Sequence, residues 1–270
     1  MPLTTIQDSV VRPLVEALSR RPAGLITDID GTISPIAPTP AEAVVTPLCR
    51  RFLSELCARL DLVAAVSGRS AEDAYDMLGI QGMVYVGNHG LETWRNGRVE
   101  VLPEAKDYLP LIAAAVADVA AATHHLAGII YENKGVTASI HYRLSPDRAL
   151  ARQSILEALE ASEASSRLRL TEGRMVVEIR PPVQANKGTA VETLLRTANL
   201  RGAVYLGDDV TDVDAFRALR RWASAGNGLG LSVGVLAAET PAAVRENTDL
   251  TVEGVAQVEN LLERLAVAVP

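Results

Sequence analysis

The chain has 270 residues and a mass of 28.7 kDa, enough for one large domain or for two small ones that each bury a core. With 48% hydrophobic and 22% charged residues, its composition is that of a folded globular protein and excludes a largely disordered one. The formal net charge of -7 provides no positive field to attract a phosphate backbone, so we expect no nucleic-acid partner.

The start of the chain and its cysteines indicate the compartment. Acidic residues interrupt the apolar residues of positions 1–22, which predicts a helix and not a secretion signal. The alanine-rich run 111–122 is far shorter than the roughly 20 residues that a membrane span requires. Cys49 and Cys57 fall in one predicted helix about 12 Å apart, which no disulfide can bridge. We therefore expect a cytoplasmic protein that does not associate with a membrane.

The first part of the chain alternates between predicted strands and helices. Short apolar runs at 23–28, 61–66 and 83–86 predict buried parallel strands, and helical spacing of apolar residues predicts helices at 48–60 and 71–78. This alternation predicts half of a doubly wound sheet, in which the loops after the strands carry the chemistry.

From about Leu91 the pattern changes to α+β. The pair Asn96–Gly97 between two short strand-like runs predicts a hairpin. The following elements predict an αββαββ layer with an antiparallel sheet, built from helices at 107–126 and 146–162 and strand pairs at 128–143 and 167–180.

After Pro181–Pro182 the strand and helix alternation resumes. The predicted elements are helices at 187–199, 211–220, 241–246 and 253–267 and strands at 203–208, 231–236 and 249–252. The sequence therefore predicts an α/β fold: a Rossmann-like, doubly wound parallel-sheet core of residues 1–106 and 183–270, with an inserted α+β domain at 107–182.

Polar residues at the predicted strand ends should meet at one edge of the core sheet. Asp28 and Asp30 follow the first strand, Ser67 the second and Asp208 a later one, while Lys187 opens a helix. Carboxylates of this kind suit Mg²⁺, which cancels their repulsion of a phosphate dianion. Ser67 and Lys187 can hold the phosphoryl oxygens. Taken singly, these residues can also be an Asx turn, a helix start or a solvated lysine, but their joint order favours a phosphoryl-transfer site.

Four ordered segments resemble the motifs of haloacid dehalogenase-type phosphatases: DIDGT at 28–32, SGR at 67–69, KG at 187–188 and GDDVTD at 207–212. The resemblance spans almost the whole chain, and the inserted layer resembles the cap domain of these enzymes. Within that superfamily the chain resembles the trehalose-6-phosphate phosphatases, through DIDGTISPIAPTPAEA at 28–43, VSGRS at 66–70, GNHGLE at 87–92, YENKG at 131–135, HYR at 141–143, GRMVVEIRP at 173–181 and GDDVTDVDAF at 207–216.

The resemblance implies Mg²⁺-dependent hydrolysis of trehalose 6-phosphate to trehalose and phosphate through an aspartyl-phosphate. Asp28 would be the nucleophile, and Asp30 would act first as general acid and then as general base. Asp28, the backbone carbonyl of Asp30 and Asp208 would hold Mg²⁺. Ser67 and Lys187 would hold the phosphoryl group.

Further residues take supporting roles in this resemblance. Asp209 and Asp212 would orient metal ligands or waters. Arg69 would contact the sugar phosphate or stabilise its loop. His89 follows the third strand and is either a substrate contact or structural.

Sugar recognition is expected in the inserted domain. Glu132, Lys134 and Glu178 match the acidic and basic residues with which similar enzymes bind sugar hydroxyls. We expect strand alternation to place the side chains of His141, Arg143 and Arg180 on the opposite sheet face from the glutamates.

Three other functions compete with this interpretation. One is a phosphatase of the same mechanism for sucrose phosphate, a glycosylglycerate phosphate or an aminocyclitol phosphate. The second is a non-catalytic sugar-phosphate sensor, and the third is a receiver-type phosphate acceptor. The expected partners are a small sugar phosphate and a separate trehalose-6-phosphate synthase in the same pathway.

Overall fold

The computed structural model describes residues 6–95, 97–173 and 175–269. Contacts divide the chain into two compact units; the second unit is Glu100–Gln184, and the first consists of the chain on either side of it. The second unit contains the predicted inserted domain of 107–182 and also includes the 3-10 helix η3 (Pro103–Tyr108), which contacts the helix that follows it. Among the helices in these described ranges, none combines the length and the apolar character that crossing a membrane demands.

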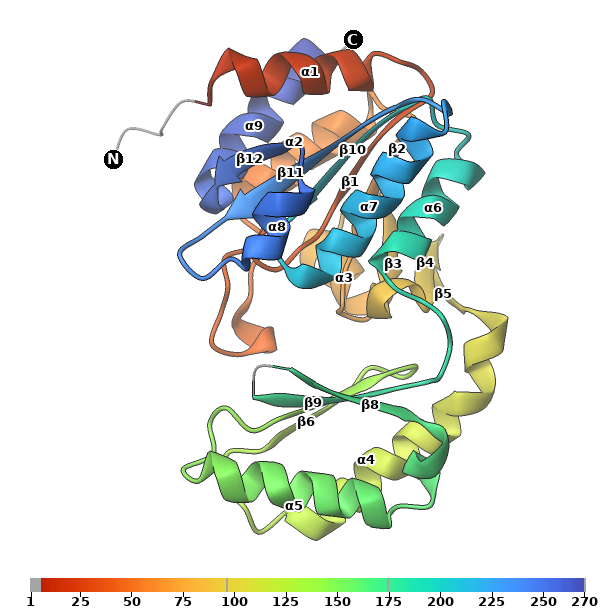
Figure 1. The fold of residues 1–270 in the computed structure, drawn as a ribbon, viewed down its shortest axis with the longest axis vertical. Helices are drawn as coiled ribbons and strands as arrows, with labels where there is room; N and C mark the ends of the chain where they lie inside the picture. The colour runs from red at the N-terminus through yellow and green to blue at the C-terminus, as the bar shows by residue number, and fades with distance from the viewer. Residues whose placement is uncertain (1–5, 96, 174, 270) are drawn as a thin grey trace. The chain divides into compact units, whose positions relative to one another are not determined.

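A large mixed sheet forms the centre of the first unit (Figure 1). Among the described residues its strand order is β12-β11-β10-β1-β2-β3-β4-β5. Neighbours from β12 to β3 run parallel, and β4 runs antiparallel to β3. The strands are β1 (Ala23–Thr27), β2 (Leu62–Val66), β3 (Val84–Gly87), β4 (Glu92–Arg95), β5 (Arg98–Val101), β10 (Gly202–Gly207), β11 (Leu229–Leu236) and β12 (Leu250–Glu253).

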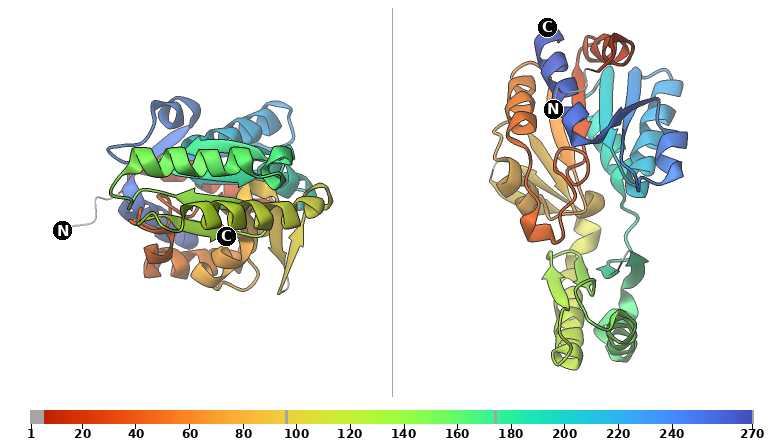
Figure 2. Two further views of the ribbon diagram at one scale, coloured as in Figure 1. Left: turned by 90° about the horizontal axis from the view of Figure 1, so that it is seen from below. Right: turned by 90° about the vertical axis from the view of Figure 1, so that its left-hand side faces the viewer.

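Helices cover both faces of this sheet, as the right-hand view in Figure 2 shows. One face packs on α1 (Asp8–Leu18), α2 (Pro47–Cys57), α3 (Ala71–Leu78) and α9 (Gly254–Ala268). The other packs on α6 (Lys187–Thr197), α7 (Val210–Ser224) and α8 (Ala242–Asn247). Strands β1, β2 and β10 are buried along their whole length because both faces are covered, which explains their unbroken apolar runs. The predicted doubly wound α/β fold is confirmed.

Two details of the first unit bear on the predictions. Strands β4 and β5 are neighbours in the sheet, as the predicted hairpin requires; Asn96 of its turn lies outside the described residues, as do residues 1–5 of the predicted first helix and Arg174. Cys49 and Cys57 both lie in α2 and are free thiols.

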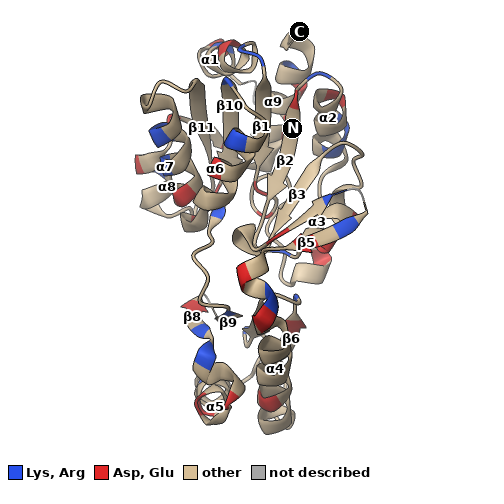
Figure 3. Cartoon of the chain, turned by 90° about the vertical axis from the view of Figure 1, so that its right-hand side faces the viewer, with Lys and Arg blue, Asp and Glu red and all other residues tan. Residues whose placement is uncertain are grey.

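The second unit has the predicted αββαββ order. Its described residues form an antiparallel sheet of order β6-β7-β9-β8, covered on one face by two helices (Figure 2). The elements are α4 (Leu109–Thr123), β6 (Ile130–Asn133), β7 (Ala138–His141), α5 (Arg148–Ala161), β8 (Arg169–Gly173) and β9 (Val176–Arg180). Among the described residues, 3-10 helices also form at η1 (Pro40–Glu42) and η2 (Asn88–Gly90) in the first unit and at η4 (Ala164–Arg167) in the second. Basic and acidic segments are interspersed over both units (Figure 3).

Candidate active site

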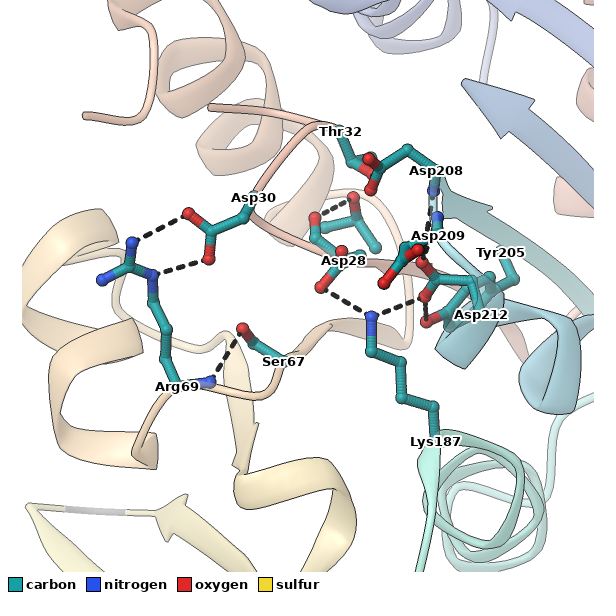
Figure 4. A network of polar contacts seen from close by, with 11 residues as sticks. Asp28, Asp30, Thr32, Ser67, Arg69, Lys187, Tyr205, Asp208, Asp209 and Asp212 are labelled. Atoms are coloured by element: carbon teal, nitrogen blue, oxygen red, sulfur yellow. Dashed lines mark hydrogen bonds and ion pairs between the residues drawn. The ribbon is translucent and has the colours of Figure 1, made fainter. Parts of the chain in front are cut away.

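The predicted site residues of the first unit gather at the carboxyl ends of three neighbouring parallel strands. Strands β10, β1 and β2 lie side by side and run in the same direction, so the loops that follow them meet at one edge of the sheet. The amino-terminal ends of α6 and α7 reach the same place (Figure 4). The edge predicted from the sequence is therefore formed.

Lys187 lies at the centre of this arrangement and is 2% exposed. It is the first residue of α6, where the side chain of Asn186 accepts a hydrogen bond from the Thr189 amide and caps the helix. Its Nζ lies 2.7 Å from Asp212 Oδ1 and 3.0 Å from Asp28 Oδ1. Burial alone would lower the Lys187 pKa, but the two carboxylates outweigh it and raise the pKa above its ordinary value. Lys187 is therefore a fixed positive charge.

One cation does not neutralise the carboxylates around it. Burial is the main reason that the pKa of Asp28 is raised well above its ordinary value; Lys187 opposes this shift, and Asp212, Asp208 and Asp30 add to it. Burial, followed by the neighbouring Asp212 carboxylate, also raises the pKa of Asp208 to about 7. The site thus holds more negative charge than its own lysine balances.

These carboxylates fit a divalent cation. One carboxylate oxygen from each of Asp28, Asp208 and Asp212 lies within 4.8 Å of the others. Carboxylate oxygens are hard ligands, and the raised pKa values of Asp28 and Asp208 reflect their burial and the repulsion from neighbouring carboxylates. Mg²⁺ or a similar ion would be bound by such ligands, with water and phosphate completing the coordination.

Hydrogen bonds distinguish Asp212 from the other two carboxylates. Its Oδ1 accepts from Lys187 Nζ at 2.7 Å and from the Tyr205 hydroxyl at 2.6 Å, while its Oδ2 accepts from the amides of Asp208 at 3.2 Å and Asp209 at 3.1 Å. Two donors contact each oxygen, so Asp212 is held in place by its neighbours, and its predicted role of orienting metal ligands or waters stays a prediction. Asp28 and Asp208 are therefore the carboxylates better suited to contact a metal ion.

Tyr205 is a site residue that sequence reasoning missed. It lies in the middle of β10, fully buried, and burial together with the Asp212 carboxylate raises its pKa, so the phenol stays protonated and donates. A tyrosine in an otherwise apolar, buried strand requires a hydrogen-bond partner for its hydroxyl. This feature of the sequence could have indicated that Tyr205 contacts a polar residue of the site.

The DIDGT segment has a local reason for its glycine. Gly31 has φ +80°, and a Cβ at this position would lie 2.0 Å from Asp208 Oδ2. The next residue, Thr32, donates its hydroxyl to Asp208 Oδ1 at 3.2 Å. Glycine therefore allows the loop after β1 to approach the loop after β10 closely.

Asp30 and Arg69 form a pair at the side of this cluster. Arg69 Nε lies 2.7 Å from Asp30 Oδ2, and Arg69 Nη2 lies 2.8 Å from Asp30 Oδ1. Arg69 Nη2 also donates to the carbonyl of Pro40 at 3.0 Å, and the Arg69 amide donates to Ser67 Oγ at 3.2 Å. Of the two roles predicted for Arg69, these contacts favour stabilisation of the loops, while its predicted contact with substrate stays a prediction.

The loop after β2 is anchored by residues of the GNHGLE segment. His89, at φ +57°, donates its amide to the Ser67 carbonyl, and its ring fills the space where Gly68 has no side chain. The buried carboxylate of Glu92 accepts from the Ala71 amide at 2.7 Å, at the start of α3. These contacts give His89 a structural role in holding Ser67, which is 1% exposed.

Asp209 is the exposed N-cap residue of α7.

In the second unit, Glu132 is the centre of a small charged cluster. Its Oε2 lies 2.9 Å from His141 Nε2 and 3.6 Å from Lys134 Nζ. The strand register places Glu132 opposite Ser139, and Ser139 opposite Glu178, so both glutamates lie on the same face of the sheet.

His141 and Arg180 lie on this face as well, and the prediction that they would lie on the opposite one is wrong. His141 is two residues from Ser139 along β7, and Arg180 is two residues from Glu178 along β9. The intervening side chains of these strands, Ile140 and Ile179 among them, point to the core beneath α4 and α5. Arg143 lies beyond the end of β7 and is exposed.

The raised pKa of Asp208 predicts the pH dependence of stability in metal-free protein. Because the pKa is about 7 in the folded protein against an ordinary 3.8, the folded state binds more protons between these pH values. The free energy of unfolding should therefore fall by a few kcal/mol as pH rises from about 4 to about 7. Asp28, whose pKa is also raised, contributes to the same decline. We therefore expect Asp208→Asn to make the decline shallower without removing it in urea unfolding with EDTA, and an unchanged slope would contradict the assignment.

Comparisons with known proteins agree with this geometry. A sequence model of the trehalose-phosphatase family matches residues 26–251. A probable trehalose-phosphate phosphatase of Sinorhizobium fredii is 36% identical over 214 residues, which cover 78% of this chain and 77% of that protein. Trehalose-phosphate phosphatase B of Arabidopsis thaliana is 30% identical over 268 residues, which cover 93% of this chain and 68% of that protein.

A solved structure supports the fold independently. The C-terminal domain of the C. albicans trehalose-6-phosphate phosphatase matches with a TM-score of 0.75 at 22% identity, over 97% of each chain. The matched family segment includes all four motifs and the whole second unit. The chain belongs to the trehalose-phosphatase family.

Proposed function

We propose that this protein is a phosphatase that hydrolyses trehalose 6-phosphate to trehalose and phosphate through an aspartyl-phosphate on Asp28. The observation that carries the proposal is the buried contact of Asp28 with Lys187 beside Asp208, in a chain of the trehalose-phosphatase family. A binding module has no need for a buried carboxylate held against a lysine at the end of a strand.

In the first step, an Asp28 oxygen attacks phosphorus as the bond from phosphorus to the sugar oxygen breaks. Asp30 gives its proton to the departing sugar oxygen. Lys187 and Ser67 hold the phosphoryl oxygens and balance their charge. Asp212 keeps Lys187 oriented toward Asp28, since it accepts from the same Nζ atom.

In the second step, water attacks the phosphorus of the aspartyl-phosphate, and Asp30 takes a proton from that water. The bond between phosphorus and Asp28 breaks, phosphate leaves and Asp30 carries the proton again, so the cycle closes without a further reactant. Mg²⁺ held by Asp28, Asp208 and the backbone carbonyl of Asp30 would supply positive charge to the phosphoryl oxygens.

We assign the sugar to Glu132, Lys134 and Glu178 in the second unit. The two glutamates share one face of a sheet, and each carboxylate can accept two hydroxyl hydrogen bonds. Lys134 and His141 limit the movement of Glu132. We place the reaction in the cytoplasm, in keeping with the free thiols of Cys49 and Cys57, and infer that a separate trehalose-6-phosphate synthase supplies the substrate.

A panel of sugar phosphates tests the reaction and the substrate together. We expect phosphate release from trehalose 6-phosphate to exceed release from sucrose phosphate, a glycosylglycerate phosphate and an aminocyclitol phosphate, and to stop with EDTA. Preferred turnover of another panel member would retain the reaction and overturn the substrate. Binding without turnover by folded protein would indicate a sensor.

The sugar assignment predicts a specific variant. Glu178→Gln should raise the KM for trehalose 6-phosphate about 10- to 100-fold, because a hydrogen bond to a charged group contributes about 1.5–3 kcal/mol. The matched control is Glu172→Gln, a glutamate of the same sheet that is exposed and paired with Arg152 of α5. Equal kinetics of the two variants would exclude Glu178 from the sugar site.

A further inference from the structure

Arg69 contacts both carboxylate oxygens of the proposed acid and base, Asp30. Two parallel hydrogen bonds of 2.7 and 2.8 Å join the guanidinium to both carboxylate oxygens. This bidentate geometry fixes the carboxylate plane as well as its position. The Arg69 side chain is 12% exposed and that of Asp30 is 36% exposed, so the pair is partly shielded from solvent.

The same arginine is held from two other directions. Arg69 Nη2 donates to the Pro40 carbonyl in the loop after β1, and the Arg69 amide donates to Ser67 Oγ in its own loop. Arg69 therefore connects the loop that carries the proposed acid to the loop that carries a proposed phosphoryl ligand. The Nε and Nη2 atoms of the guanidinium therefore donate to acceptors within the protein, the Asp30 carboxylate and the Pro40 carbonyl.

Asp30 and Asp28 stand in different surroundings. In Figure 4 the Asp30 carboxylate points to Arg69, whereas Asp28 points to Lys187. The Asp28 side chain is 6% exposed, so the proposed nucleophile is deep and the proposed acid is at the rim. An in-line displacement requires this separation, because the attacking and leaving oxygens are on opposite sides of phosphorus.

We propose that Arg69 is a positioning residue that orients Asp30 toward the leaving oxygen and stabilises the carboxylate that forms there. This inference rests on the proposed function. When Asp30 gives its proton to the sugar oxygen, negative charge appears on its two oxygens, and both already face guanidinium donors. Charge that develops in the transition state is stabilised by donors that are in place beforehand. The same contact then holds the carboxylate for the proton it takes from water.

A double-mutant cycle with trehalose 6-phosphate tests this role. Arg69→Met should lower kcat about 10- to 100-fold and leave KM within about twofold. Asp30→Asn should lower kcat about 10²- to 10⁴-fold, the usual contribution of a general acid. Arg69→Met should have almost no further effect in the Asp30→Asn protein, since Arg69 acts through Asp30. Arg69→Lys should recover part of the loss, because it keeps the charge without the paired donors.

The control is Arg51→Met, which removes an arginine from an exposed pair with Glu55 on α2 and should leave kinetics unchanged. A binding measurement separates the alternatives. The affinity is measured by calorimetry in Asp28→Asn protein, because this variant is expected not to hydrolyse the substrate during the titration. There, Arg69→Met should leave the affinity for trehalose 6-phosphate unchanged within about twofold.

Three results would overturn the inference. A raised KM with unchanged kcat, or a tenfold loss of affinity in the calorimetric test, would make Arg69 a ligand of the substrate. An equal loss of kcat with and without Asp30 would make its role independent of Asp30. If Arg69→Met does not fold, Arg69→Lys must show the same dependence on Asp30. Absence of phosphate release by the unaltered protein would instead refute the proposed function.

Discussion

Asp28→Asn is expected to lower the rate of phosphate release from trehalose 6-phosphate by more than about 10⁴-fold. An amide does not form the covalent intermediate, and removal of a nucleophile commonly has effects of this size or larger. The measurement is the initial rate of phosphate release at saturating substrate and Mg²⁺. Asp76→Asn, an exposed aspartate of α3, is the control and should keep full activity.

The same variant should fold at least as well as the original protein. Asparagine has the shape of aspartate and keeps an acceptor for Lys187. In the metal-free protein, burial disfavours the charged form of Asp28, as its raised pKa shows. The substitution to asparagine removes this cost of burying a charge. Thermal unfolding with EDTA should give a Tm that is unchanged or higher. Turnover above about 1% of the original rate would place the nucleophile elsewhere, and loss of folding would show that the lost rate is not chemical.

Lys187→Met is expected to destabilise the first unit by about 3–5 kcal/mol near neutral pH and to remove activity. The lysine is the counterion of two buried carboxylates, Asp28 and Asp212, and removing one partner of a buried ion pair leaves an uncompensated charge. Urea unfolding followed by tryptophan fluorescence reports on this unit, because both tryptophans, Trp94 and Trp222, belong to it.

A second substitution tests the cause of this destabilisation. Lys187→Met combined with Asp28→Asn should recover part of the lost free energy, since one of the two unpaired charges is then gone. Lys106→Met, at an exposed position of η3, is the control for loss of a lysine. A loss below about 1 kcal/mol for Lys187→Met, or no recovery in the double variant, would contradict a stabilising role for the buried pair.

The order of strands and helices could be predicted because each element carries its own periodic pattern. Strand β1 is an unbroken apolar run, and the predicted helix at 71–78 coincides with α3. The parallel alternation then brings Asp28, Ser67 and Asp208 to one edge, which follows from topology and requires no knowledge of side-chain contacts.

Contacts between elements distant in sequence could not be predicted in the same way. That Tyr205 reaches Asp212 depends on how α7 packs on β10, and that Arg69 reaches Asp30 depends on the shapes of two loops. Neither has a periodic signal in the sequence.

The faces of the second sheet show a further limit. Which face His141 occupies is decided by the register between β6 and β7, where a shift of one residue reverses every side chain. The sequence predicts a strand pair at 128–143 without setting that register. The register pairs Glu132 with Ser139 and thereby brings His141 to Glu132.

The most direct test of the account is the conversion of trehalose 6-phosphate by the unaltered protein with Mg²⁺, measured as both products. We predict trehalose and phosphate in equal amounts, and no formation of either by Asp28→Asn. Folded protein that binds trehalose 6-phosphate and releases no phosphate would contradict the account.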